Sequence, residues 1–246
     1  MEIATLGTIL SVWAHPDDET YLAAGVMAAA GDLGQRVVCV SATAGEHGTT
    51  DPAAWPPHRL ASVRGWEFAA AMAVLGVGEH RLLGLPDGML SECEGPGLAA
   101  VSALIEQVRP DTILTFGADG VTFHPDHIAI HHWVTEAWRR DGCRSRLLYA
   151  SPTVAHLDRV GDLYEEWGVY MSDERPIGVS VAQLAVHLDV QGSALDRKLT
   201  ALRCLASQTG AVMASLDPGV YAAIVTEEAF VEASPVTTGV EHFAFR

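Results

Sequence analysis

Two short polar motifs in this 246-residue sequence are suited to metal chemistry. The first, Ala14-His15-Pro16-Asp17-Asp18-Glu19, directly follows an apolar run, and the second is His124-Pro125-Asp126-His127. Imidazole nitrogens and carboxylate oxygens are common ligands of zinc and ferrous sites. Several such groups would be costly to bury together unless a cation balanced them. The two motifs therefore predict a divalent metal site.

The spacing within each motif explains how the side chains can converge. His15 and Asp18 flank a proline-fixed turn, so both can point at one spot. His124 and His127 stand at an expected helix start, where a three-residue spacing puts both rings on one side. Two imidazoles and one carboxylate would hold the metal and leave positions open, and the remaining histidine could stabilise an oxyanion. Asp17 cannot easily share the ion with its neighbour and is free to act as a general base.

Both motifs also have simpler interpretations. Asp17, Asp18 and Asp126 are all good helix-capping residues, but capping does not require histidine, so two such turns favour the metal site. His131 forms a four-residue pair with His127, which is the spacing of zincin ligands. The glutamate that should follow the first histidine of that motif is replaced by isoleucine, and the second histidine lies a full turn deeper in the helix. We therefore place His131 outside the predicted ligand set.

The elements around the motifs alternate between strands and helices over the first 150 residues. Apolar runs predict strands at residues 7–13, 35–43, 80–83, 112–116 and 146–150. Helical patterns lie between them at residues 19–33, 59–75, 96–108 and 125–140. This alternation predicts a Rossmann-like three-layer α/β/α fold with a mostly parallel sheet. Because ligands bind at the carboxyl ends of such strands, both motifs should meet at one edge of the sheet.

We expect one domain over residues 1–246, with a βα core at residues 1–150. Residues 151–246 have a less regular pattern and should complete the sheet and the pocket. In this second part the sequence predicts a strand, a helix and a tail of short β-like runs, at residues 187–190, 194–207 and from 218 onward.

Composition restricts the class of partner and the cellular setting. The formal net charge is −16 and the chain has one lysine, which argues against nucleic acid or an anionic membrane surface. A small-molecule substrate fits better, with a homo-oligomer as one possible assembly. The four cysteines are widely spaced, as in proteins of a reducing cytoplasm. We find no basic segment before the first apolar run and no apolar stretch of the roughly 18 residues that a membrane span needs, so we expect a cytoplasmic protein.

Together, the two motifs resemble the signature of the PIG-L/LmbE-like zinc N-deacetylases. This family includes the deacetylases of N-acetylglucosaminyl-phosphatidylinositol, of mycothiol and bacillithiol precursors, and of some antibiotic sugars. Further similarity covers most of the chain, at residues 43–46, 64–67, 75–76, 85–88 and 198–208. The resemblance implies hydrolysis of a linear amide with Zn²⁺ as the cofactor, or with Fe²⁺ or another divalent metal in its place.

The resemblance also implies a role for each residue of the two motifs that matches the family pattern. His15, Asp18 and His127 match the metal ligands. Asp17 matches the general base, which later protonates the leaving amine. His124 matches the residue that helps to stabilise the tetrahedral oxyanion.

Other matching positions concern the substrate. Arg64 and Asp87 match residues that hold sugar hydroxyls in relatives, and Glu46 is expected to line the same pocket. For Arg64 the alternative is a surface salt bridge with the glutamate three residues further along its helix. Two departures affect the substrate prediction: Thr122 stands where mycothiol-type enzymes have a tyrosine, and Leu205 stands where many relatives have a histidine.

The sequence thus predicts a metal-dependent hydrolase that removes an N-acyl group from a small glycoside, for which we expect an N-acetylglucosamine conjugate. One alternative is an amidase that acts on a larger thiol conjugate or an antibiotic intermediate. Another is a non-catalytic family member that keeps only the metal. The presence of Asp17 and His124 argues against the second alternative, because a structural metal site needs neither.

Overall fold

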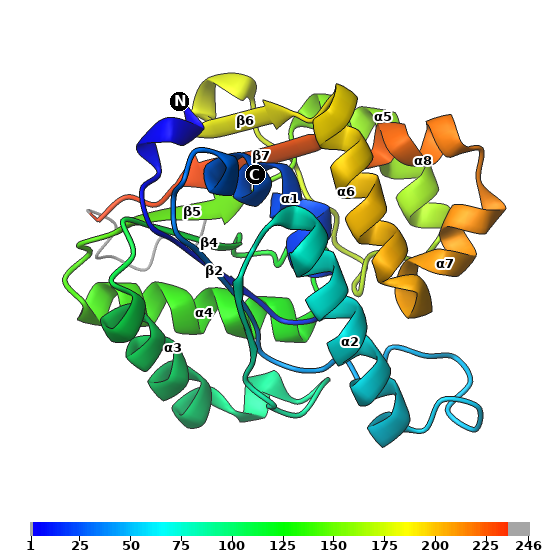
Figure 1. Cartoon of the computed structure of the whole chain (residues 1–246), viewed down its shortest axis with the longest axis horizontal. Coiled ribbons are helices and arrows are strands. Elements are labelled where there is room, and N and C mark those ends of the chain that lie inside the picture. Colours follow the sequence, from blue (N-terminus) through cyan, green and yellow to red (C-terminus); the bar gives the residue numbers. More distant parts are fainter. Residues whose placement is uncertain (1, 236–246) are drawn as a thin grey trace.

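A computed structural model describes residues 2–235, and a seven-stranded sheet runs through its centre in the order β3-β2-β1-β4-β5-β7-β6 (Figure 1). The strands are β1 (Ile9–Trp13), β2 (Val37–Ser41), β3 (Glu79–Leu82), β4 (Thr112–Phe116), β5 (Arg146–Ala150), β6 (Val186–Asp189) and β7 (Glu227–Glu232). Strands β1 to β5 pair in parallel, and β7 pairs antiparallel with both β5 and β6. The predicted α/β fold with a mostly parallel sheet is confirmed.

Helices cover both faces of the sheet. They are α1 (Asp18–Asp32), α2 (Pro57–Leu75), α3 (Glu94–Val108), α4 (Pro125–Arg140), α5 (Val154–Glu166), α6 (Gly192–Cys204), α7 (Ala206–Ser215) and α8 (Pro218–Ile224). Short 3₁₀ turns lie at Ile3–Thr5, Leu90–Glu92 and Val181–Gln183. Helices α1, α2 and α6 pack together on one face, and α3 packs with α4 on the other (Figure 1). Among the helices that the structure describes, none is both long and apolar enough to cross a membrane.

The central strands are buried along their whole length because helices cover both of their faces. Every residue of β1, β2 and β4 is buried, as expected for the nearly continuous apolar runs of parallel strands. Below the polar motifs, Trp13 at the end of β1 meets Phe116 at the end of β4 edge to face, with ring centroids 4.9 Å apart. The side chains that carry chemistry are therefore built on a rigid base.

The chain order of the sheet reverses between β1 and β4. From β1 the sheet continues through β2 to β3, whereas on the other side β4 continues to β5. In such sheets a crevice forms outside the carboxyl ends of the two strands where the order reverses. The motif at residues 14–19 follows β1 and the motif at residues 124–127 follows β4, so both lie where the order reverses.

Predictions for the C-terminal part need correction. Helix α5 was not predicted, although Thr153 caps it by accepting a hydrogen bond from the backbone N–H of His156. The helix predicted at 194–207 ends at Cys204, because Leu205 leaves the helical conformation before α7 begins. Pro218 begins helix α8 rather than a β-like run, in the first helical position that proline favours. The tail then forms β7, as predicted.

Candidate metal centre

The three residues predicted as metal ligands meet at the carboxyl ends of β1 and β4. His15 Nδ1 lies 3.2 Å from His127 Nε2. The carboxylate of Asp18 lies 3.3 Å from His127 Nε2 through Oδ1 and 3.5 Å from His15 Nδ1 through Oδ2. Each of the three side chains offers one ligand atom, and these atoms lie within 4.8 Å of one another. The turn after β1 and the first turn of α4 thus form one compact donor set.

The contacts of the outer nitrogen of each ring indicate which nitrogen carries the lone pair. His127 Nδ1 donates a hydrogen bond to the carbonyl of Gly120 at 2.9 Å, so its Nε2 carries the lone pair. His15 Nε2 lies 3.0 Å from Asp87 Oδ1 and 3.3 Å from Asp126 Oδ2. A carboxylate can only accept here, so this nitrogen carries the hydrogen and Nδ1 carries the lone pair. When both rings are neutral, two lone pairs therefore face each other beside a carboxylate, an arrangement that fits a bound cation.

The pKa values of these groups also indicate that the cluster favours a positive charge. Burial lowers the pKa of His15, but hydrogen bonds with Asp126, Asp18 and Asp87 outweigh burial and raise it well above its usual value. Burial lowers the pKa of His127 to about 4, so this ring stays neutral and can act as a ligand. Burial opposes ionisation of Asp18, yet the neighbouring His127 and His15 hold its pKa well below the usual range. A divalent ion would supply the charge that this cluster attracts.

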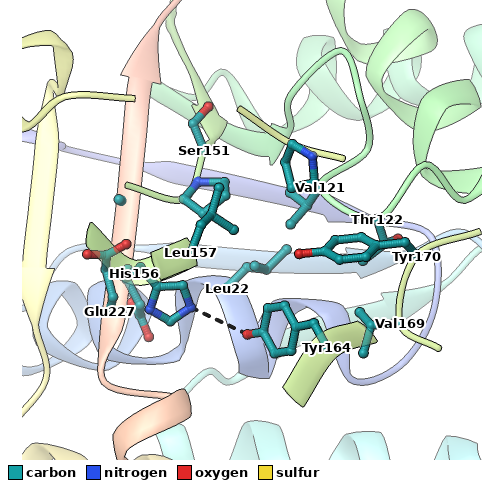
Figure 2. Close-up of a pocket in the computed structure, with 14 residues that line it drawn as sticks. Leu22, Val121, Thr122, Ser151, His156, Leu157, Tyr164, Val169, Tyr170 and Glu227 are labelled. Carbon is teal, nitrogen blue, oxygen red and sulfur yellow. Dashed lines mark hydrogen bonds between the residues drawn. The ribbon is translucent and has the colours of Figure 1, made fainter. Parts of the chain in front are cut away.

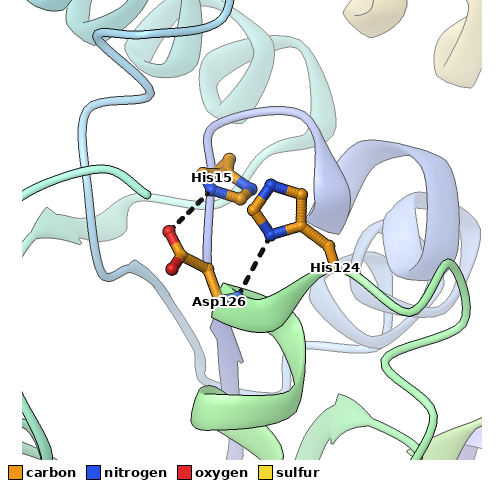
Figure 3. Close-up of side chains that lie close together, drawn as sticks. All are labelled: His15, His124 and Asp126. Carbon is orange, nitrogen blue, oxygen red and sulfur yellow. Dashed lines mark hydrogen bonds and ion pairs between the residues drawn. The ribbon is translucent and has the colours of Figure 1, made fainter. Parts of the chain in front are cut away.

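A second trio, consisting of His15, His124 and Asp126, is also close enough to hold an ion (Figure 3). Its donor atoms are already in use, however. Asp126 accepts hydrogen bonds from the backbone N–H groups of Gly88, at 2.7 Å, and Leu90, at 3.0 Å. His124 Nδ1 caps α4 by accepting the N–H of Asp126 at 3.1 Å. We therefore favour the set of His15, Asp18 and His127, in which Asp126 orients His15.

The hydrogen bond by which His124 caps α4 also defines the tautomer of its ring. Because Nδ1 accepts a hydrogen bond, the neutral ring carries its proton on Nε2. Burial and the nearby His15 lower the pKa of His124, which favours this neutral form. Its ring centroid lies 4.8 Å from that of His15 and 4.9 Å from that of His127. His124 thus places a hydrogen-bond donor beside the donor set.

Asp17 combines strained backbone with an unusual carboxyl group. Its φ of 146° lies in a region that residues with a side chain rarely adopt, as is typical of functional sites. Burial raises the pKa of its carboxyl to about 6, against the opposing effect of the Arg64 guanidinium, whose Nη2 lies 3.1 Å from Oδ2. The Asp17 N–H donates to the carboxylate of Glu19 at 3.1 Å. A carboxyl group with this pKa can exchange protons near neutral pH.

Arg64 is buried beneath the turn at residues 14–19. It donates from Nη2 to the carbonyl of Pro16 at 2.7 Å and from Nη1 to the carbonyl of Gly45 at 2.8 Å. A side chain at Gly45 would collide with the guanidinium, so glycine is needed for this close approach. The alternative of a surface salt bridge is wrong, because Arg64 is 3% exposed and Glu67 accepts hydrogen bonds from the start of α7 instead.

Asp87 and Glu46 lie on two loops that close around His15. Asp87 Oδ2 accepts the N–H of His47 at 2.8 Å, while its Oδ1 faces the His15 ring. Glu46 Oε1 accepts the N–H of Asp87 at 3.0 Å. These contacts connect the loop after β2 with the loop after β3 and orient one ring of the donor set. The binding of sugar hydroxyls by these residues, and by Arg64, stays a prediction.

The remaining candidate residues are His131 and Glu19. His131 donates from Nδ1 to the carbonyl of Phe116 at 3.0 Å and belongs to neither trio within the described residues, as expected. Glu19 lies in the first helical turn, as its sequence position predicts; it is completely buried, and burial raises its pKa to about 8. Only its place directly after two aspartates distinguishes it in the sequence.

Comparison with known proteins places the fold and motifs in context. Residues 10–138 match the family model described as PIG-L, GlcNAc-PI de-N-acetylase. A 1D-myo-inositol 2-acetamido-2-deoxy-alpha-D-glucopyranoside deacetylase from Rhodococcus opacus is 30% identical over 265 residues, covering 91% of this chain and 90% of that protein. Alignments with two other curated deacetylases of the same name span only 44% and 61% of those proteins.

Solved structures share the fold at low identity. The N,N'-diacetylchitobiose deacetylase from Pyrococcus horikoshii has a TM-score of 0.67 and 19% identity, covering 98% of this chain and 88% of that one. The 4-carboxy-2-hydroxymuconate hydratase GalB from Pseudomonas putida KT2440 has a TM-score of 0.61 and 20% identity, with coverage of 95% and 99%. Because these two structures differ in reaction, the fold alone does not define the chemistry. The matching family model and the Rhodococcus relative, by contrast, show that the chain belongs to the PIG-L family of GlcNAc-PI de-N-acetylases.

Proposed function

We propose that this protein is a Zn²⁺-dependent hydrolase that removes the acetyl group from an N-acetylglucosamine unit of a small glycoside. The observation that carries the proposal is the convergence of two imidazole lone pairs and the Asp18 carboxylate beside Asp17. Two imidazoles and one carboxylate, with positions left open, suit hydrolytic zinc, although Fe²⁺ can use the same donors. Family membership and the deacetylase names of the relatives support the same reaction class.

The residues around the donor set divide the chemistry among them. His15, Asp18 and His127 would hold the ion, which supplies Lewis acidity and activates water at neutral pH. Asp17 would take a proton from the attacking water, because its raised pKa suits a general base near neutrality. His124 would donate from Nε2 to the carbonyl oxygen as negative charge develops there. Asp17 would then return its proton to the leaving amine.

The substrate class comes from the relatives rather than from the fold. The curated relatives are named for a glucosaminide of myo-inositol, and the Pyrococcus structure for diacetylchitobiose, so both act on N-acetylated glucosamine units. Arg64, Asp87 and Glu46 would bind or position the sugar. A cytoplasmic location also stays a prediction, supported by four free cysteines, and self-association stays a prediction that light scattering can test.

Metal loading and turnover should be measured together. The chain is stripped of metal, reloaded with Zn²⁺ or Fe²⁺, and assayed for free amine from N-acetylglucosaminyl-inositol and simple N-acetylglucosaminides. We expect one ion per chain and turnover in the wild type and in His132→Ala, a control on the exposed side of α4. His15→Ala should lose both. Full metal content in His15→Ala would reject the ligand set, and bound metal without turnover of any amide would favour the non-catalytic alternative.

A further inference from the structure

A cavity of about 60 Å³ is lined by residues that follow the ends of several strands (Figure 2). On the scale by which one water needs at least ~10–15 Å³, it has room for about four to six water-sized groups. Its walls come from α1, from the loops after β4 and β5, from α5 with the segment that follows it, and from the start of β7. The cavity therefore lies at the same carboxyl edge of the sheet as the metal centre.

Thr122 joins the cavity to the metal centre. It lines the cavity, and its Oγ1 lies 3.2 Å from Nδ1 of the proposed ligand His127. Its carbonyl also accepts a hydrogen bond from the N–H of Met171 at 2.8 Å, which brings the neighbouring Tyr170 into the wall. The wall also includes Leu22, which lies one helical turn after Asp18 on α1. The cavity is thus one side chain, Thr122, away from the outer edge of the His127 ring.

The free surface of the cavity is mostly apolar. Aliphatic side chains and tyrosine rings form most of it, namely Leu22, Val121, Leu157, Val169, Tyr164 and Tyr170 (Figure 2). The carboxylates and the imidazole in the wall already have partners in the protein. Glu227 accepts two hydrogen bonds from Thr153, and His156 contacts Arg159 through Nδ1 and the Tyr164 hydroxyl through Nε2. Because these polar groups are paired, a ligand would gain mainly by burying apolar surface.

We propose that this cavity is a specificity subsite that binds an apolar part of the substrate, a short alkyl chain or a ring. The proposal rests on the function proposed above, since it assumes an amide at the metal centre. The apolar group can belong to the acyl chain or to the aglycone of the sugar, and the two sources share the same chemistry. In either case the cavity would favour substrates more apolar than a plain N-acetylglucosaminide.

Two substrate series distinguish an apolar group on the acyl chain from one on the aglycone. One series lengthens the N-acyl chain from acetyl to hexanoyl on a methyl glucosaminide, and the other lengthens the O-alkyl aglycone from methyl to hexyl on N-acetylglucosamine. Each methylene buried in the cavity should raise kcat/KM by up to about fourfold, until the cavity is full. We expect this rise in one series and a flat response in the other. A flat response in both series would overturn the proposal.

A variant that fills the cavity should lose the preference for substrates with longer apolar chains. Leu157→Trp places a larger ring in the cavity from α5, and Ala155→Trp adds the same ring on the exposed side of that helix as a control. We expect Leu157→Trp to abolish the rise, and Ala155→Trp to keep both the rise and the wild-type turnover of the acetyl methyl glucosaminide. A rise that persists in Leu157→Trp would contradict the subsite. Tyr170→Ala, which should shift the optimum to longer chains, serves as a second variant if the first does not fold.

Binding measured without turnover separates this proposal from the proposed function. Calorimetry of alkyl glucosaminides and of N-acyl analogues with the zinc-loaded chain should show affinity that increases with chain length in one series. The increase should be absent in Leu157→Trp and present in Ala155→Trp. If no substrate is hydrolysed but this pattern appears, the proposed function fails and the subsite stands. Equal affinities along both series would reject the subsite whatever the activity.

Discussion

Helix α1 carries two buried clusters of charge that differ in how fully their members are paired. In its middle, Lys198 Nζ lies 2.7 Å from Glu228 Oε1 and donates to the carbonyl of Tyr21 at 2.7 Å. Glu228 also accepts the backbone N–H groups of Gly25, at 2.7 Å, and Val26, at 2.8 Å. Both charged side chains are essentially inaccessible to solvent. Each charge in this cluster has a partner from the protein itself.

At the N-terminus of the same helix the pairing is incomplete. His15 and His127 turn lone pairs toward each other, and Asp18 adds a negative charge at the same place. A buried pair that is complete holds the fold together, whereas a buried group that needs an additional cation marks a ligand site. The comparison teaches that burial of charge alone does not identify function, but the direction of donors and lone pairs does.

The largest effect on activity should appear when Asp17 is neutralised. Asp17→Asn is expected to lower kcat by as much as about 10⁴-fold, because the general base is lost. Stability should change by less than ~1 kcal/mol, since Asp17 is partly accessible and asparagine keeps an oxygen that can accept the hydrogen bond from Arg64. Steady-state kinetics and urea unfolding measure the two effects. Unfolding by several kcal/mol in Asp17→Asn would remove the distinction between the clusters.

Breaking the complete pair should act on stability instead. Lys198→Met leaves the Glu228 carboxylate buried without its cation, and we expect a loss of about 3–5 kcal/mol in the free energy of unfolding. Urea denaturation of the metal-free protein measures this loss. As a control, Arg140→Ala removes an exposed ion pair with Glu136 on α4 and should cost no more than ~0.5 kcal/mol. A Lys198→Met protein as stable as the wild type would show that this pair is not needed.

Zinc should stabilise only the incomplete cluster. At 100-fold to 1,000-fold excess over the dissociation constant, one bound ion adds about 3–4 kcal/mol to the free energy of unfolding. We expect this gain in the wild type and none in Asp18→Asn, which lacks a ligand charge. Thermal unfolding with and without Zn²⁺ gives the comparison. Equal stabilisation of Asp18→Asn would place the ion elsewhere.

The smallest effect concerns His131, a half-buried histidine that is neither a proposed ligand nor part of the ion pair. Burial lowers its pKa to about 4, against an unfolded value of about 6.5. Between pH 6.5 and 4 the unfolded chain binds a proton that the folded chain does not, so stability falls as the pH drops through this window. We expect a loss on the order of 1–2 kcal/mol between pH 7 and 5. His131→Gln should reduce this loss without changing zinc affinity, and an unchanged pH dependence would contradict the assignment.

The first 150 residues could be predicted because their signals are local. Apolar runs marked β1, β2, β4 and β5, and the parallel topology then placed residues 14–19 and 124–127 at one edge. The meeting of the two motifs therefore followed from the fold class. The arrangement of lone pairs did not, because it depends on the carbonyl of Gly120 and on a carboxylate from a third loop.

Most of what was missed depends on partners far away in the sequence. The buried contacts of Arg64 were not predicted, because its partners belong to the turn after β1 and the loop after β2. Lys198 and Glu228 lie in unrelated segments, and only folding brings them to α1. The positive φ of Asp17 has no signal in its own residue type. Helices α5 and α8 differ from these cases, because the capping residues Thr153 and Asp217 were local signals.

The bonds from Glu228 to helix α1 span 203 and 202 residues of the chain. During synthesis, the first helix leaves the ribosome long before the strand that secures it. A nascent chain halted before β7 would already contain all three proposed metal ligands. It would still lack Glu228, which pairs with Lys198 and bonds to the helix that contains Asp18. Contacts this distant in sequence slow folding, and domains of this size pass through partly folded states. The turn at residues 14–19 would thus be among the first segments made and the last to be fixed in position. The metal centre should therefore form only after synthesis has passed β7.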